Sequence, residues 1–110
     1  MNIYLNHVAL NVKDFDWYEN FFTSVCGMSS YRRDSVSPTR KIWFTEGIQL
    51  NETTEDLPVK GIYDHIGFHA DDVAAFVKAA KDAGCGDVPG KDHWFKLPNG
   101  VKVEVKCYSK

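Results

Sequence analysis

Cysteine, proline and excess charge are all scarce in this chain of 110 residues. Its three cysteines show no Cys-x-x-Cys spacing, so we expect no disulfide framework and a reducing, cytoplasmic location. The net charge of −2 provides no electrostatic basis for binding nucleic acid or an anionic membrane surface. No apolar run approaches the roughly 18 residues that a membrane span requires, and the first residues lack the basic and apolar stretches of a secretion signal. We therefore expect a cytoplasmic protein that binds neither nucleic acid nor membrane.

Aliphatic and aromatic residues, by contrast, are plentiful. Hydrophobic residues make up 44% of the chain, and they include seven Phe, five Tyr and three Trp. This content is sufficient for one packed core and excludes a disordered tail. A chain of this length favours a single domain.

The two halves of the sequence resemble each other at an offset of 58 positions. Leu-Asn-His-Val-Ala-Leu at 5–10 aligns with Tyr-Asp-His-Ile-Gly-Phe at 63–68, which places His7 over His65. An offset near half the chain indicates duplication of one supersecondary unit rather than short solenoid repeats. We therefore predict one domain, residues 1–110, made of a first module at 1–52, a linker at 53–61 and a second module at 62–110.

Each half shows the pattern of a strand, a helix and then several short strands. Residues 6–12 alternate polar and apolar side chains, as a half-buried strand does. A helix follows, with Asp14 as its N-cap and Gly27 ending it, and the second half repeats this with Asp71 or Asp72 as the cap. One apolar stripe lies on each predicted helix: Phe15, Tyr18, Phe22 and Val25, then Val73, Phe76, Val77 and Ala80. Further strands are predicted at about 30–34, 41–44, 48–51, 94–97 and 101–106, with a weak segment near 87–88.

Alternation along these strands places polar residues on the side of the sheet that the helices leave uncovered. That side carries His7, Asn11, Gln49, Asn51, His65, His69, Lys102, Glu104 and Lys106. An ordinary solvated sheet face is one explanation. A histidine at the same register in each half, with one carboxylate, is also a facial set for a divalent metal that leaves positions open for water or substrate. His7, His65 and Glu104 are therefore candidate ligands, and Gln49 is a weak fourth. His69 and His93 lack the support of the repeat, and we treat both as ordinary surface or pocket-rim residues.

Five motifs in a characteristic order carry a family resemblance that covers essentially the whole chain. They are His-Val-Ala-Leu-Asn-Val at 7–12, Trp-Tyr-Glu-Asn-Phe-Phe at 17–22, Gly-Met at 27–28, Asp-His-Ile-Gly-Phe at 64–68, and Leu-Pro-Asn-Gly-Val-Lys-Val-Glu-Val at 97–105. With them the sequence resembles the vicinal oxygen chelate superfamily of glyoxalases, bleomycin-resistance proteins, fosfomycin-resistance thiol transferases and extradiol dioxygenases. The last motif is similar to the family's turn-plus-glutamate ending, with Leu-Pro-Asn-Gly in place of the commoner Asp-Pro-Asp-Gly.

The resemblance implies an α+β fold of two βαβββ modules. These form a curved, partly open mixed sheet with helices on the outer face and a central metal cleft, and small members of the family form homodimers with clefts shared between chains. Carried over by position, the resemblance makes His7, His65 and Glu104 the ligands of a divalent ion (Zn, Ni, Mn or Fe). Gln49 occupies the position at which glyoxalase I-like enzymes have a glutamate, so Glu104 is the only carboxylate of the set.

Two functions of different class follow from the resemblance. In the first, the metal acts as a Lewis acid on a small oxygen-rich substrate, in a lyase, isomerase or thiol-transferase reaction, and Glu104 is both ligand and catalytic proton shuttle. Because an amide cannot take up a proton, Gln49 disfavours an isomerisation that uses two glutamates. In the second, the chain is a metal-free protein that sequesters a small ligand, as bleomycin-resistance proteins do. The retained His and Glu ligands favour the first function. Contacts to the small-molecule substrate are predicted at Asn51, Trp43, Lys102 and Arg40.

Overall fold

The computed structural model describes residue 2, residues 5–58 and residues 64–107. The chain divides into two compact units, Met1–Asp56 and Leu57–Lys110. Residues 59–63, which hold part of the predicted linker and the start of the predicted second module, lie outside the described residues, as do residues 108–110 at the end of that module. Among the described residues, no helix is both long enough and apolar enough to cross a membrane.

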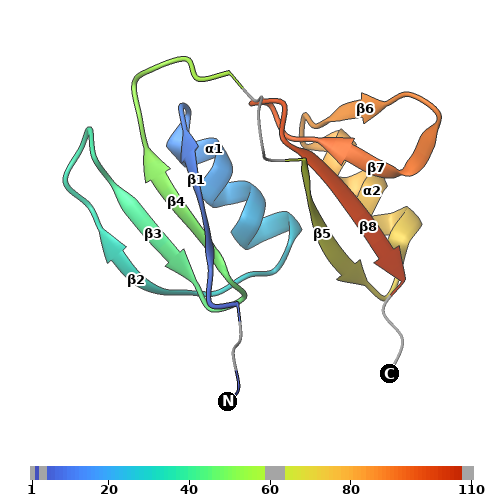
Figure 1. Cartoon of the computed structure of the whole chain (residues 1–110), viewed down its shortest axis with the longest axis horizontal. Coiled ribbons are helices and arrows are strands. Elements are labelled where there is room, and N and C mark those ends of the chain that lie inside the picture. The colour runs from blue at the N-terminus through green and yellow to red at the C-terminus, as the bar shows by residue number, and fades with distance from the viewer. Residues whose placement is uncertain (1, 3–4, 59–63, 108–110) are drawn as a thin grey trace. The chain divides into compact units, whose positions relative to one another are not determined.

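The first unit is a four-stranded mixed sheet with one helical segment packed on it (Figure 1). Its elements are β1 (Val8–Val12), α1 (Phe15–Asn20), the π-helical turn η1 (Phe21–Val25), β2 (Ser30–Asp34), β3 (Lys41–Phe44) and β4 (Ile48–Glu52). The strand order is β1-β4-β3-β2, with β1 and β4 parallel and the other neighbours antiparallel. A parallel pair requires a long crossover between its strands, and the helix and the β2–β3 hairpin supply it.

The second unit repeats this arrangement. Its elements are β5 (His65–Ala70), α2 (Val73–Asp82), β6 (Gly86–Val88), β7 (Lys91–Lys96) and β8 (Lys102–Cys107). The strand order is β5-β8-β7-β6, and again the first and last strands are parallel. The predicted α+β class, with one βαβββ module in each half, is confirmed. The main difference in boundaries is β7, which begins three residues earlier than the predicted strand at 94–97.

The core of each unit lies between its sheet and its helix. In the first unit the ring centroids of Phe22 and Phe44 are 6.0 Å apart, and in the second those of Phe76 and Phe95 are 5.5 Å apart. The predicted alternation holds along β8 and the residue before it: the helix-facing residues are Val101, Val103 and Val105, each at most 5% exposed. Lys102 and Glu104, on the other side, are half-buried. Burial of each such apolar side chain stabilises the fold by about 1.5–3 kcal/mol, so the covered face of the sheet dominates stability.

The first helical segment has the predicted limits, but it lacks the predicted side-chain cap and is not α-helical throughout. Asp14 occupies the N-cap position, but its backbone is left-handed (φ 34°, ψ 52°) and its side chain caps no backbone N–H, whereas Asp72 accepts a hydrogen bond from Ala75 N at 3.0 Å. After Asn20 the helix widens into the π-helical turn η1. Such a turn adds a residue and rotates the buried stripe. Phe21 is therefore buried beside Phe22, and Val25, which was predicted on the stripe, is only half-buried. Gly27 ends the segment with φ +69°, as its position predicted.

Candidate metal centre

The predicted ligands lie two in each unit: one directly before or at the start of the first strand, and one on the last strand. In the second unit, His65 begins β5 and Glu104 lies on the neighbouring parallel strand β8. Their side chains meet, with His65 Nε2 at 3.5 Å from Glu104 Oε1. The structure therefore brings these two predicted ligands together.

The tautomer of His65 is set by the residue that precedes it. His65 Nδ1 lies 2.6 Å from Asp64 Oδ2, and an ionised carboxylate can only accept, so Nδ1 carries the hydrogen. This hydrogen bond, together with the charge of Lys102, lowers the pKa of Asp64. In the neutral ring, Nε2 then presents its lone pair toward Glu104. A histidine whose second nitrogen donates to a carboxylate is the usual arrangement around a protein-bound metal.

The spacing of His65 and Glu104 fits a cation between them. A neutral Nε2 and a carboxylate oxygen are both acceptors, so they repel unless a proton or a metal ion lies between them. Two ligand atoms each about 2.0–2.1 Å from a zinc ion, at a tetrahedral angle, are about 3.3–3.4 Å apart. The observed 3.5 Å is close to that value. Two ligands are half of a site, and within the described residues no three His, Cys, Asp or Glu side chains are grouped so as to hold a metal ion.

Trp94 and His93 surround the same carboxylate, and the sequence interpretation missed this. Trp94 is the register partner of Glu104 on β7, is 8% exposed, and has its ring centroid 4.7 Å from that of His65. Its Nε1–H donates to His93 Nε2 at 3.1 Å, and the same nitrogen lies 4.0 Å from Glu104 Oε2. Each oxygen of Glu104 thus faces an imidazole. Alternation along the chain places Trp94 and Lys96 on one face of their strand, but only the pairing register of β7 with β8 shows that this face is the one that carries Glu104.

His7, the predicted ligand of the first unit, lies directly before β1 rather than within a strand at 6–12. The first ladder hydrogen bond runs from Val8 N to Gly47 O (2.8 Å), so regular pairing begins one residue later. His7 Nδ1 is 2.7 Å from Asn6 Oδ1, and His65 Nδ1 likewise contacts a side-chain oxygen of its own preceding residue, Asp64, at 2.6 Å. Both halves of the repeat therefore place a polar acceptor next to the histidine, which leaves Nε2 available as a ligand atom.

Gln49 is the most buried polar residue of the predicted set, at 8% exposure. Its Nε2 donates to Asn51 Oδ1 at 2.8 Å, and Asn51 Nδ2 donates to Asn11 Oδ1 at 3.3 Å. Trp43 lies opposite Gln49 on β3, and the Arg32 guanidinium stacks 4.5 Å from its ring centroid. The uncovered face of the first sheet thus combines three amides, an indole and a cation.

Of the two predicted cationic substrate contacts, Arg40 is already paired. Its Nη2 lies 2.7 Å from Glu52 Oε2, its Nη1 lies 2.7 Å from Asp16 Oδ1, and the guanidinium covers the ring of Phe15 at 4.6 Å. These contacts join β4 to α1. Lys102, by contrast, is half-buried on β8 as the register partner of His65. We therefore keep Lys102 as a candidate contact.

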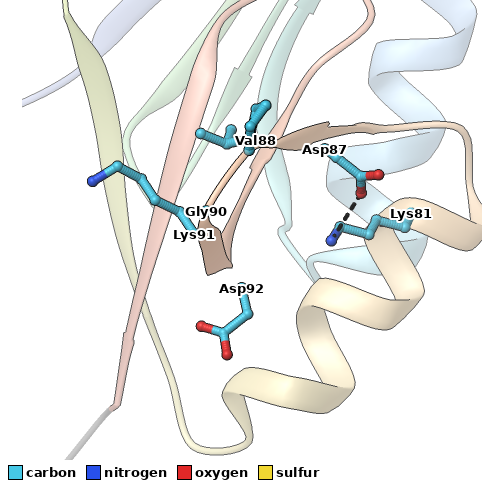
Figure 2. A pocket seen from close by; sticks show the side chains of 7 residues that line it. Lys81, Asp87, Val88, Gly90, Lys91 and Asp92 are labelled. Carbon is cyan, nitrogen blue, oxygen red and sulfur yellow. Dashed lines mark ion pairs between the residues drawn. The ribbon is translucent and has the colours of Figure 1, made fainter.

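A pocket of about 490 Å³ lies beside the β6–β7 turn (Figure 2). It is lined by Lys81, Asp87, Val88, Pro89, Gly90, Lys91 and Asp92. None of the predicted site residues lines it. Lys81 Nζ and Asp87 Oδ1 form an ion pair at 3.0 Å, so these two charges compensate each other. We assign no ligand to this pocket.

Comparison with known proteins identifies the fold. No family model matches the sequence, and no curated protein matches it. A solved structure of the fosfomycin resistance protein FosX from Listeria monocytogenes superposes with a TM-score of 0.78 at 20% identity, over 99% of this chain and 94% of that one. FosX from Mesorhizobium loti gives 0.75 at 19% identity, over 96% and 91%. The trypanothione-dependent glyoxalase I of Leishmania major gives 0.72 at 19% identity, over 94% and 86%.

The chain therefore has the fold of the vicinal oxygen chelate superfamily, and the resemblance seen in its sequence motifs is confirmed at the level of the fold. At these identities the likeness extends to architecture, whereas function depends on the side chains at the site.

Proposed function

We propose that this chain is a metal-dependent enzyme that acts on a small, oxygen-rich substrate, in a reaction of the lyase, isomerase or thiol-transferase type. The observation that carries the proposal is the approach of His65 Nε2 to Glu104 Oε1, at 3.5 Å, with His65 Nδ1 held by Asp64. A sequestering protein has no need of such a pair. The similarity in fold to glyoxalase I and to FosX is consistent with an enzyme of this kind.

The proposed ligand set is His65 and Glu104, completed by His7 and, as a weak fourth ligand, by Gln49. His7 is the counterpart of His65 in the repeat, and both use Nδ1 for a neighbouring acceptor. A set of two imidazoles and one carboxylate suits Zn, Ni, Mn or Fe and leaves positions open for substrate. A bound ion would supply Lewis-acid polarisation of substrate oxygens.

Glu104 is proposed as both ligand and catalytic residue. Its Oε1 faces His65 at 3.5 Å, whereas His93 Nε2 is 4.0 Å from Oε2, so Oε2 is the oxygen proposed to take up a proton from the substrate and return it. With an amide at position 49, no second carboxylate of the ligand set can share this task. The proposed reaction therefore uses one proton-transfer group.

Trp43 and Lys102 are proposed as substrate contacts, because the indole offers an apolar surface and the ammonium an anion partner. Arg40 has no proposed role in binding, because Glu52 and Asp16 already engage its guanidinium.

Metal uptake tests the proposal. The purified protein, stripped with chelator, is incubated separately with Zn²⁺, Ni²⁺, Mn²⁺ and anaerobic Fe²⁺, desalted, and assayed by elemental mass spectrometry. We expect about one ion per chain for at least one metal, and loss of that ion in His65→Ala. Glu55→Ala, which removes an exposed carboxylate elsewhere, is the control and should bind as the wild type does. A chain that retains none of the four ions contradicts the enzyme proposal and leaves the metal-free binding protein.

The proposed assembly is a cytoplasmic homodimer whose metal sites take ligands from both chains. Mixing His7→Ala with Glu104→Ala protein tests it, because a heterodimer then contains one intact ligand set out of two. We expect metal binding to recover in the mixture after subunit exchange. No recovery, with exchange demonstrated by mass spectrometry, indicates ligand sets within single chains.

A further inference from the structure

Gln49 is an unusual residue for its place in the first sheet. Among the described residues it is the one polar or charged residue that is buried, although it lies on the face without the helix. A buried amide must satisfy both its donor and its acceptor. Its Nε2 does so through Asn51 Oδ1 at 2.8 Å. No hydrogen bond to Gln49 Oε1 is made within the described part of the chain, and no fully buried side-chain oxygen or nitrogen there lacks a partner, so Oε1 is not fully buried.

The amides beside Gln49 form a chain with a direction. Asn51 accepts from Gln49 and donates to Asn11 Oδ1 at 3.3 Å, so each amide turns its NH₂ toward the next one. Asn11 and Asn51 face each other across the parallel β1–β4 ladder, and Gln49 is two residues before Asn51 on β4. The three side chains therefore share one face by register. Among the described residues, this direction leaves the Gln49 carbonyl at one end of the hydrogen-bonded series and the Asn11 NH₂ at the other.

We propose that Asn11 and Asn51 are positioning residues that hold the Gln49 amide with its NH₂ in the chain and its carbonyl oxygen outward, as a ligand atom for a divalent cation. If the series of amide hydrogen bonds ran in the opposite direction, Asn51 Nδ2 would donate to Gln49 Oε1. Gln49 would then present only N–H groups, which repel a cation. The orientation of Gln49 thus decides whether its side chain binds or excludes a metal. This role in metal binding rests on the proposed function, whereas the orientation itself does not.

Solvent exchange of the side-chain NH₂ hydrogens, measured by NMR on ¹⁵N-labelled, metal-free protein, tests the orientation. We expect Gln49 hydrogens to exchange at least about fivefold more slowly in the wild type than in Asn51→Leu, which removes their acceptor. Asn51→Asp and Asn11→Asp should keep the protection, because a carboxylate accepts as the amide oxygen does. Lys41→Met is the matched control, since Lys41 is the register partner of Asn51 on β3 and makes no bond to the chain of amides. Equal exchange in the wild type and in Asn51→Leu overturns the proposal, and so does protection of Asn11 with fast exchange at Gln49, which indicates the reversed chain.

A double-mutant cycle tests the consequence for metal binding. The Ni²⁺ affinity of each variant is measured by titration calorimetry. Residues that orient a ligand typically change metal affinity by 10–100-fold, so Asn51→Leu should weaken Ni²⁺ binding by about tenfold. In a Gln49→Leu background the same substitution should have no further effect. If Asn51→Leu weakens Ni²⁺ binding equally in the wild type and in Gln49→Leu, the proposal is overturned, because Asn51 then does not act through Gln49. If the wild type binds no Ni²⁺ or other divalent ion, the proposed function fails, and the exchange measurement alone supports or overturns the orientation.

Discussion

Two neighbouring residues of β8, Val103 and Glu104, should respond to truncation in opposite ways. Val103 is 1% exposed on the helix-covered face, whereas the Glu104 side chain is 22% exposed on the opposite face. Val103→Ala removes two buried methyl groups, worth about 1.6 kcal/mol at roughly 0.8 kcal/mol per carbon. The cavity left behind raises the expected loss of unfolding free energy to about 2–2.5 kcal/mol. Glu104→Ala should change it by no more than about 0.5 kcal/mol, because that side chain lies on the face without the helix and its removal leaves no cavity between sheet and helix.

For metal affinity we expect the reverse order, with the larger loss in Glu104→Ala and the smaller in Val103→Ala. Loss of a residue that only orients a ligand costs 10–100-fold, so removal of a ligand should cost at least about 100-fold. We expect Glu104→Ala to weaken binding of the preferred metal by that much and Val103→Ala to leave it within about threefold.

Urea unfolding of the metal-free proteins and calorimetric metal titration of the folded ones measure the two effects. A loss of about 2 kcal/mol is easily resolved against a typical total of 5–15 kcal/mol. If Glu104→Ala destabilises the metal-free protein as much as Val103→Ala does, the two residues do not lie on different faces. If Glu104→Ala binds metal as the wild type does, Glu104 is not a ligand.

Three further predictions concern stability and reactivity. Asp72→Ala should lower the unfolding free energy by about 1 kcal/mol, because it removes the side-chain cap of α2. Asp14→Gly should raise it by about 0.5–1 kcal/mol, because the Asp14 backbone is left-handed and its side chain caps no backbone N–H. Urea unfolding measures both changes. Hydrogen bonds from Arg40 lower the pKa of Glu52, so this carboxylate stabilises the fold above the ordinary glutamate pKa of about 4.3 and the effect is lost as the pH falls through the lowered value. Unfolding free energy should thus fall more steeply between about pH 5 and pH 3 in the wild type than in Glu52→Gln. Burial raises the pKa of the Cys85 thiol to about 11, so iodoacetamide at pH 8 should modify this residue, detected by peptide mass spectrometry, only when the protein is unfolded.

Each of these predictions has an outcome that contradicts it. A loss of stability in Asp14→Gly similar to that in Asp72→Ala would mean that both aspartates cap their helices. Parallel pH curves for the wild type and Glu52→Gln would mean that the ion pair contributes no stability. Rapid alkylation of native Cys85 would mean that the second core opens to solvent.

The fold was predictable because its signals are local or repeated. Strand side chains alternate with a period of two, so the sequence alone separates Val103 from Glu104 without knowledge of the partner strand. The repeat of a polar residue followed by histidine marks His7 and His65 as equivalent. The π-helical turn was not predictable from the 3.6-residue pattern. An α-helical stripe accommodates Phe21 or Phe22 but not both, and only packing against the sheet shows that both are buried.

The candidate site divides in the same way. By itself the sequence determined which residues share the uncovered face and that a histidine opens each module, because these properties depend only on side-chain parity and duplication. The tertiary structure alone decided which side chains meet: it placed His65 against Glu104, brought Trp94 and His93 to the same carboxylate, and engaged Arg40 in ion pairs. Such contacts depend on the register between strands and on helix packing, which join residues far apart in the chain and leave no periodic trace in it.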